Sequence, residues 1–101
     1  MGEETLTLGG NIELTGFKEV DPRSMVVLKK IIGNYVRKFS DHYKNFKGIK
    51  IVLKTVGSNE YQLKASLDLD KGNAHVENHG KNIFEAVDSL LKHAERVLEK
   101  G

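Results

Sequence analysis

The sequence predicts an α+β protein, a two-layer sandwich with the element order β-α-β-β-β-α. Two segments repeat apolar side chains every three or four residues, as amphipathic helices do. Four others alternate apolar and polar residues, as half-buried strands do. Turns rich in glycine and asparagine separate these segments. We therefore expect a four-stranded mixed sheet with both helices on one face, in which the first and second strands are parallel.

The N-terminal region leaves two interpretations open. Apolar residues alternate with polar ones between Leu6 and Leu14, around a Gly-Gly-Asn turn. This pattern suits either a β-hairpin or a tail that leads into one strand over residues 11–15. We expect residues 1–10 to be a tail or an extra strand. Residues 11–101 then form a single domain, which the length of the chain favours.

The first helix is predicted to begin at Asp21 and Pro22, because aspartate accepts hydrogen bonds from first-turn amides and proline is tolerated at the first helical position. Its end is open: Ser40 could stop it near residue 40, or Gly48 could cap it near residue 46. Its apolar stripe is expected to face the sheet and comprises Met25, Leu28, Ile32, Tyr35, Val36, Phe39 and Tyr43.

The rest of the chain predicts three strands and a second helix. The strands are expected over residues 49–56, 61–69 and 74–78, with a tight hairpin turn at residues 70–73. Asn82 and Glu85 resemble a capping pair that opens a helix reaching about Lys100. The opposite face of that helix is expected to be solvated, with an Asp88–Lys92 pair four residues apart, and carries Glu85, Asp88, Lys92, Glu95, Arg96 and Glu99.

Charge is strongly segregated along the chain. The segment from Arg23 to Lys54 holds nine basic residues and one acid, Asp41, so its net charge is about +8. The other 69 residues carry about −6, which leaves +2 overall. A concentrated cationic zone attracts anionic partners, of which nucleic acid is the commonest large one. The simpler alternative is a solvated helix face that needs no partner.

Within the first helix, four cations recur every seven residues: Arg23, Lys30, Arg37 and Lys44. Seven residues make nearly two turns, so the row drifts only about 20° per step and lies opposite the apolar stripe. Its members lie about 10 Å apart, a spacing that suits several phosphates of one folded RNA. Gly33 beside the row has two interpretations: close approach of a partner's backbone, or relief of packing against the sheet.

The outward face of the sheet is predicted to carry Lys50, Lys54 and Lys64 and no aromatic side chain. Base stacking on that face is therefore not expected, and recognition would depend on shape and phosphates. The candidate nucleic-acid-binding residues are Arg23, Lys29, Lys30, Arg37, Lys38, Lys44, Lys47, Lys50 and Lys54.

The sequence gives no catalytic, metal or cofactor motif, so we expect a non-enzymatic protein without a cofactor. The absence of cysteine excludes disulfides and thiolate sites. His75 and His79 are four residues apart, but on the strand expected there they would lie about 13 Å apart, too far to share a metal ion. No secretory signal or membrane-spanning run is visible, so a cytoplasmic protein without a membrane partner is expected.

Three segments resemble the ribosome hibernation promoting factor family, also called ribosome-associated inhibitor or sigma-modulation proteins. Residues 11–16 (NIELTG) resemble the family's opening strand, residues 51–54 (IVLK) its second strand, and residues 80–91 (GKNIFEAVDSLL) the start of its last helix. The resemblance implies the same β-α-β-β-β-α sandwich, akin to the double-stranded-RNA-binding domain. Members of the family bind the small ribosomal subunit in the messenger and transfer-RNA channel and silence idle ribosomes.

By that resemblance, Lys29, Lys30, Arg37 and Lys38 occupy the helix that carries ribosome-facing cations in the family. The chain departs from the pattern in its second helix, which is no more basic than acidic, and in its first ten residues, which have no clear counterpart. The resulting hypothesis is a module that binds structured RNA, which the resemblance implies is ribosomal, through the first helix. The alternative is a protein-interaction module, or a homodimer formed through the open sheet face or an edge strand.

Overall fold

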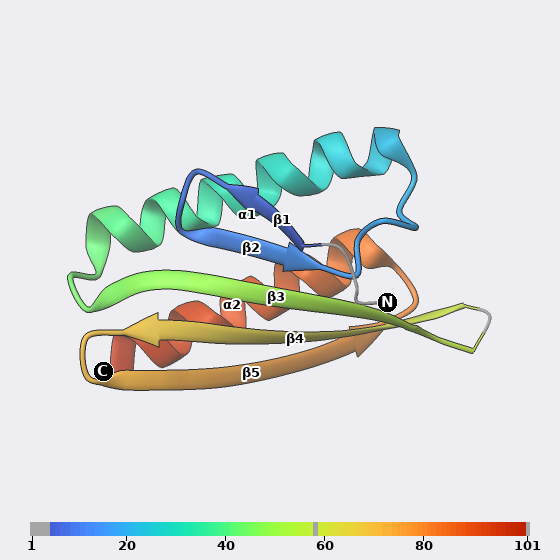
Figure 1. Cartoon of the computed structure of the whole chain (residues 1–101). Helices are drawn as coiled ribbons and strands as arrows, with labels where there is room; N and C mark the ends of the chain where they lie inside the picture. Colours follow the sequence, from blue (N-terminus) through green and yellow to red (C-terminus); the bar gives the residue numbers. More distant parts are fainter. Residues whose placement is uncertain (1–4, 58, 101) are drawn as a thin grey trace.

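The computed structural model describes residues 5–57 and 59–100, which form a five-stranded sheet and two helices (Figure 1). Along the chain the elements are β1 (Thr5–Leu8), β2 (Ile12–Thr15), α1 (Pro22–His42), β3 (Phe46–Val56), β4 (Glu60–Leu69), β5 (Gly72–Gly80) and α2 (Ile83–Lys100). The predicted α+β class and element order are confirmed.

The strands lie in the sheet in the order in which they occur along the chain. β2 and β3 are parallel and are connected through α1, whereas all the other neighbours are antiparallel. β1 is the extra strand that the sequence left open. Leu6 lies opposite Leu14 in the β1–β2 pair, so the hairpin interpretation describes residues 5–15.

Both helices cover the same face of the sheet, as predicted (Figure 1). α1 packs against β3, α2 packs against β4 and β5, and the two helices contact each other. They run in the same direction, so both begin at the same end of the molecule. The layer between them and the sheet is apolar: no polar or charged side chain is buried among the described residues. Its fully buried members include Leu14, Leu28, Ile32, Phe39, Ile51, Leu63, Leu67, Leu90 and Leu91.

α1 begins as the sequence predicts and ends between the two predicted positions. The side chain of Asp21 caps its N-terminus by accepting a hydrogen bond from the Ser24 amide at 3.4 Å. The helix ends at His42, and Tyr43 is already extended. Gly48 is therefore no helix cap but part of β3. A Cβ atom there would lie 3.1 Å from the carbonyl oxygen of Asn11, so the glycine permits β2 and β3 to approach.

Three strands are longer than predicted, of which β4 begins only one residue early, at Glu60. β3 begins at Phe46 rather than at residue 49, because Phe46, whose side chain is buried, is the register partner of Leu69 on β4; the register shifts between Phe46 and Gly48. β5 extends over Gly72–Gly80 instead of residues 74–78, which leaves only residues 70 and 71 in the hairpin loop.

α2 opens as predicted, with the side-chain oxygen of Asn82 accepting from the Phe84 and Glu85 amides at 2.9 and 3.2 Å. The expected Asp88–Lys92 ion pair is present at 3.1 Å. Within residues 5–57 and 59–100, neither helix has the length and apolar character required to cross a membrane.

Candidate nucleic-acid interface

Three cations form an exposed row on the outer surface of α1: Arg23, Lys30 and Arg37. The seven-residue spacing places them on the side of the helix opposite the buried Leu28 and Ile32, about 10 Å apart along the axis. We call these three residues the α1 row. Lys44 does not belong to it, because the helix ends at His42.

Two valines stand exposed between the first two members of the α1 row. Val26 and Val27 retain 56% and 45% of their possible exposure, whereas Leu28 beside them is fully buried. Apolar side chains among cations can pack on sugar rings or base edges while the cations bind phosphates. The surface of α1 therefore offers contact area as well as charge.

The nine predicted residues all lie exposed, but they do not share one surface. Five are on α1, and Lys44 and Lys47 lie at or just beyond the α1–β3 loop. Lys50 and Lys54 lie on the outward face of the sheet. Successive side chains of a strand point to opposite faces, and the alternate residues Ile49, Ile51 and Leu53 are buried beneath the helices. A partner seated on α1 thus lies on the opposite side of the sheet from these two lysines.

Carboxylates neutralise three of the nine cations. Lys38 pairs with Glu95 at 3.0 Å, Lys47 with Asp70 at 3.0 Å, and Lys50 with Glu13 at 3.8 Å. These are exposed pairs of modest strength, which a polyanion can compete with. In the described part of the chain no ion pair involves the remaining six, which are Arg23, Lys29, Lys30, Arg37, Lys44 and Lys54.

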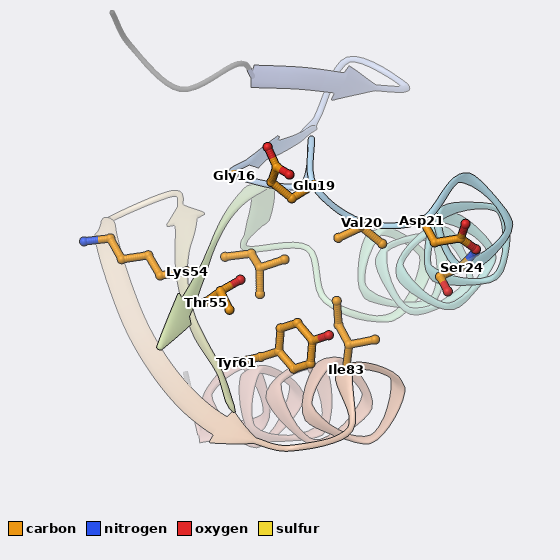
Figure 2. A pocket seen from close by; sticks show the side chains of 10 residues that line it. Gly16, Glu19, Val20, Asp21, Ser24, Lys54, Thr55, Tyr61 and Ile83 are labelled. Atoms are coloured by element: carbon orange, nitrogen blue, oxygen red, sulfur yellow. The ribbon is translucent and has the colours of Figure 1, made fainter. Parts of the chain in front are cut away.

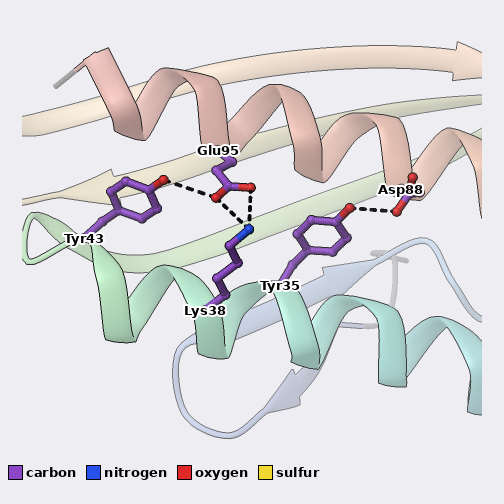
Figure 3. Close-up of polar contacts among 5 residues, drawn as sticks. All are labelled: Tyr35, Lys38, Tyr43, Asp88 and Glu95. Atoms are coloured by element: carbon purple, nitrogen blue, oxygen red, sulfur yellow. Dashed lines mark hydrogen bonds and ion pairs between the residues drawn. The ribbon is translucent and has the colours of Figure 1, made fainter.

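A polar seam joins the two helices beside the α1 row (Figure 3). The hydroxyl of Tyr35 donates to Asp88 at 2.8 Å, and the hydroxyl of Tyr43 donates to Glu95 at 3.1 Å. Lys38 reaches the same Glu95 carboxylate. The prediction that Asp88 and Glu95 belong to a solvated face was therefore wrong: both are only partly exposed and face α1.

The seam shifts the ionisation of its members. Partial burial, together with the hydrogen bond to Asp88, raises the pKa of Tyr35 from 10.0 to about 12. The same causes, with Glu95 as the partner, raise the pKa of Tyr43. The hydrogen bond from Tyr35 and the contact with Lys92 lower the pKa of Asp88. At neutral pH the tyrosines are protonated donors and Asp88 is an ionised acceptor, so the seam is fully formed.

Gly33 lies on α1 with open space beside it. A Cβ atom added there would meet no atom within 4 Å beyond the local helix backbone. The interpretation that this glycine relieves packing against the sheet is therefore wrong. Close approach of a partner remains the interpretation that gives it a function.

The histidines do not form a site. His75 and His79 lie on β5, as the strand prediction requires, and His79 contacts Glu60 of β4 at 3.3 Å. Among the described residues, no group of three or more His, Cys, Asp or Glu side chains has an arrangement that could hold a metal ion.

The fold has counterparts among solved structures. A ribosomal subunit interface protein from Coxiella burnetii superposes with a TM-score of 0.68 over 89% of this chain and 92% of its own, at 13% sequence identity. The chain shares its fold with this ribosomal subunit interface protein. The Protein Y N-terminal domain from Thermus thermophilus also superposes, with a TM-score of 0.61 over 81% of this chain and 86% of that domain, at 19% identity.

Comparisons of sequence alone give no match. No protein-family model matches the chain, and neither does any curated protein sequence. The likeness is therefore one of fold, in agreement with the sandwich that the sequence resemblance implies.

The sequence pattern did not predict the polar seam or a hollow where the two helices begin (Figure 2). The seam residues carried a weak signal: Tyr35 and Tyr43 sit at the edge of the apolar stripe, where a hydroxyl can reach a neighbouring helix. The hollow joins residues from five segments, and no local pattern marks it.

Proposed function

We propose that this protein binds the small ribosomal subunit by placing α1 against ribosomal RNA, with the α1 row contacting phosphates. The single observation that carries the proposal is the α1 row itself: three cations on one rigid helix, all exposed and none in an ion pair with residues 5–57 or 59–100. The fold shared with a ribosomal subunit interface protein supports the choice of the ribosome as the partner.

In this proposal, each arginine binds a phosphate through two hydrogen bonds, and Lys30 adds a point charge between them. Phosphate contacts fix position and orientation but do not read sequence, so binding is determined by the shape of the RNA and by salt concentration. The protein acts by occupying its site and performs no chemistry. By the family resemblance, occupation of the subunit would silence translation.

Sedimentation of the protein with purified small ribosomal subunits over a salt series tests the proposal. If Arg37 contacts a phosphate, the Arg37→Ala variant binds more weakly, and the slope of log affinity against log salt decreases by about one unit. The matched control is Arg96→Ala, which removes the same charge from the exposed surface of α2. The control should retain the wild-type slope.

An unchanged slope for Arg37→Ala would remove the α1 row from the interface. Equal losses for Arg37→Ala and Arg96→Ala would point to general charge attraction without a defined surface. The competing function is a homodimer or protein-interaction module that uses the nine-residue edge strand β5 or the outer sheet face. Mass that increases with protein concentration, without any retention on ribosomal subunits, would favour that alternative.

A further inference from the structure

β5 forms one border of the sheet, and no other described segment pairs with its outer side (Figure 1). Among the described residues, its backbone forms backbone hydrogen bonds only with β4. Proteins usually blunt such an edge with a proline, a lysine or a bulge. β5 has none of these, because its sequence is GNAHVENHG and its register with β4 is continuous from Gly72 to Gly80. The edge is therefore long, regular and open to a further strand.

The hydrogen-bond pattern of the sheet shows which backbone groups of β5 are free. The amide of Ile49 on β3 donates to the Asn11 carbonyl at 2.9 Å, toward β2. Successive residues of a strand turn their N–H and C=O groups to opposite sides, so those of Lys50 face β4. The same alternation, carried through the β3–β4 and β4–β5 registers, leaves four residues of β5 with free backbone groups. They are Asn73, His75, Glu77 and His79.

The side chains of these four residues are exposed on the outer face of the sheet, and they are complementary to one another. If two copies of β5 pair antiparallel about Val76, each His75 lies opposite the partner's Glu77. An imidazole then faces a carboxylate at two symmetric places, and each His79 faces the partner's Asn73. This register pairs all nine residues of the strand.

The neighbouring registers are less favourable. A shift by one residue sets free backbone groups against groups that already bond to β4. A shift by two residues restores the backbone bonds but pairs like with like. In one direction His75 meets the partner's His75, and in the other Glu77 meets the partner's Glu77, which is repulsive. Backbone and side chains therefore select the same register.

We propose that two copies of this chain pair through β5 as a two-fold antiparallel ladder centred on Val76. The two five-stranded sheets then join into one continuous sheet, with both helix layers on the same side. The α1 row stays outside this interface, because α1 packs against β3 in the middle of the sheet. The dimer therefore does not depend on the proposed function.

Backbone hydrogen bonds and polar pairs supply most of the attraction, since the Val76 side chain is already buried within each subunit. One pair of strands buries less than the roughly 1,200 Å² at which stable interfaces begin. We therefore expect a weak and reversible dimer, populated at high micromolar to millimolar protein. Sedimentation equilibrium over that range should show a mass that increases from one subunit to two.

Amide hydrogen exchange of the full ¹⁵N-labelled chain tests the pairing residue by residue. The amides of Ala74, Val76 and Asn78 bond to β4, so they should be protected at every protein concentration. Those of His75 and Glu77 are free in the monomer and should become protected only as the concentration rises from micromolar to millimolar. This alternating pattern is specific to an added strand, because general crowding of the surface would not select every second amide.

Exchanging the charged pair tests the register. Glu77→His sets histidine opposite histidine, and His75→Glu sets glutamate opposite glutamate. Each should weaken the dimer about tenfold, because the two-fold axis makes one substitution alter two cross-strand pairs. The double variant restores a histidine–glutamate pair and should dimerise like the wild type. Asp68→His makes a similar change on the neighbouring strand β4, and this control should leave the dimer unchanged.

The proposal is overturned if the mass remains that of one subunit up to millimolar protein. It is also overturned if the newly protected amides lie on β1 or on the helices, if both single variants dimerise like the wild type, or if the double variant does not recover. Circular dichroism melts of each variant confirm that the fold is intact. Ribosomal-subunit binding is measured separately on Arg37→Ala, so a failure of either proposal leaves the other untouched.

Discussion

Replacing Gly33 with alanine should stabilise the protein. Glycine within a helix costs roughly 0.5–1 kcal/mol relative to alanine, because the unfolded chain loses more conformational freedom on folding. The new methyl group would meet no atom within 4 Å beyond the local backbone, so no clash opposes this gain. For a domain of about 100 residues, a gain of that size raises the melting temperature by roughly 2–8 °C.

Gly10 provides a matched control with the opposite expected sign. It too has open space around its missing Cβ, but its φ angle is +83°, whereas Gly33 has a helical backbone. Alanine in the left-handed region costs about 1–2 kcal/mol. Gly10→Ala should therefore destabilise the protein, although neither substitution creates a steric contact.

Urea unfolding monitored by circular dichroism measures both effects. The midpoint should rise for Gly33→Ala and fall for Gly10→Ala, with the denaturant slope unchanged in each case. A destabilised Gly33→Ala variant would show that residue 33 is packed more closely than the structure indicates, and the reasoning would fail. If the stabilised variant also loses affinity for ribosomal subunits, the open space at Gly33 is part of the interface.

Three further predictions concern the polar seam. Tyr35→Phe should cost about 1 kcal/mol and raise the pKa of Asp88, since its largest stabilising hydrogen bond is lost. In the wild type, the lowered pKa of Asp88 contributes stability that disappears as the pH falls below about 4, and the raised pKa of Tyr35 contributes stability that disappears between about pH 10 and 12. NMR titration of Asp88 and pH-dependent melts check both; equal acid profiles in wild type and variant would contradict them. Glu95→Gln should release Lys38 and tighten binding of ribosomal subunits a few-fold, and weaker binding would count against a role for Lys38.

Local sequence signals predicted the elements whose determinants are local. Asp21 and Pro22 marked the start of α1, and the spacing of Leu28, Ile32 and Phe39 predicted which face of the helix is buried. The start of β3 was missed because Gly48 looks like a helix cap. Gly48 instead accommodates the close approach of Asn11, which lies in the turn before β2, and a contact between distant segments leaves no local pattern.

The candidate site was predictable to the extent that one helix defines it. The spacing of Arg23, Lys30 and Arg37 fixes their common direction once α1 is known. The assignment of Lys50 to the same site rested on charge along the chain, and the fold separates it from α1. An amphipathic pattern shows which side of a helix is buried, but not which neighbour meets its flank. For that reason Glu95 was assigned to solvent although it meets α1.

The two-layer construction also limits how far each charge acts. At physiological ionic strength electrostatic influence decays over about 8 Å, whereas the shortest dimension of the molecule is 23 Å. Lys54 and Lys64, on the outer face of the sheet, therefore contribute almost nothing to the potential above α1. Their charge could be inverted to change solubility or surface adsorption while the potential above α1 stayed the same.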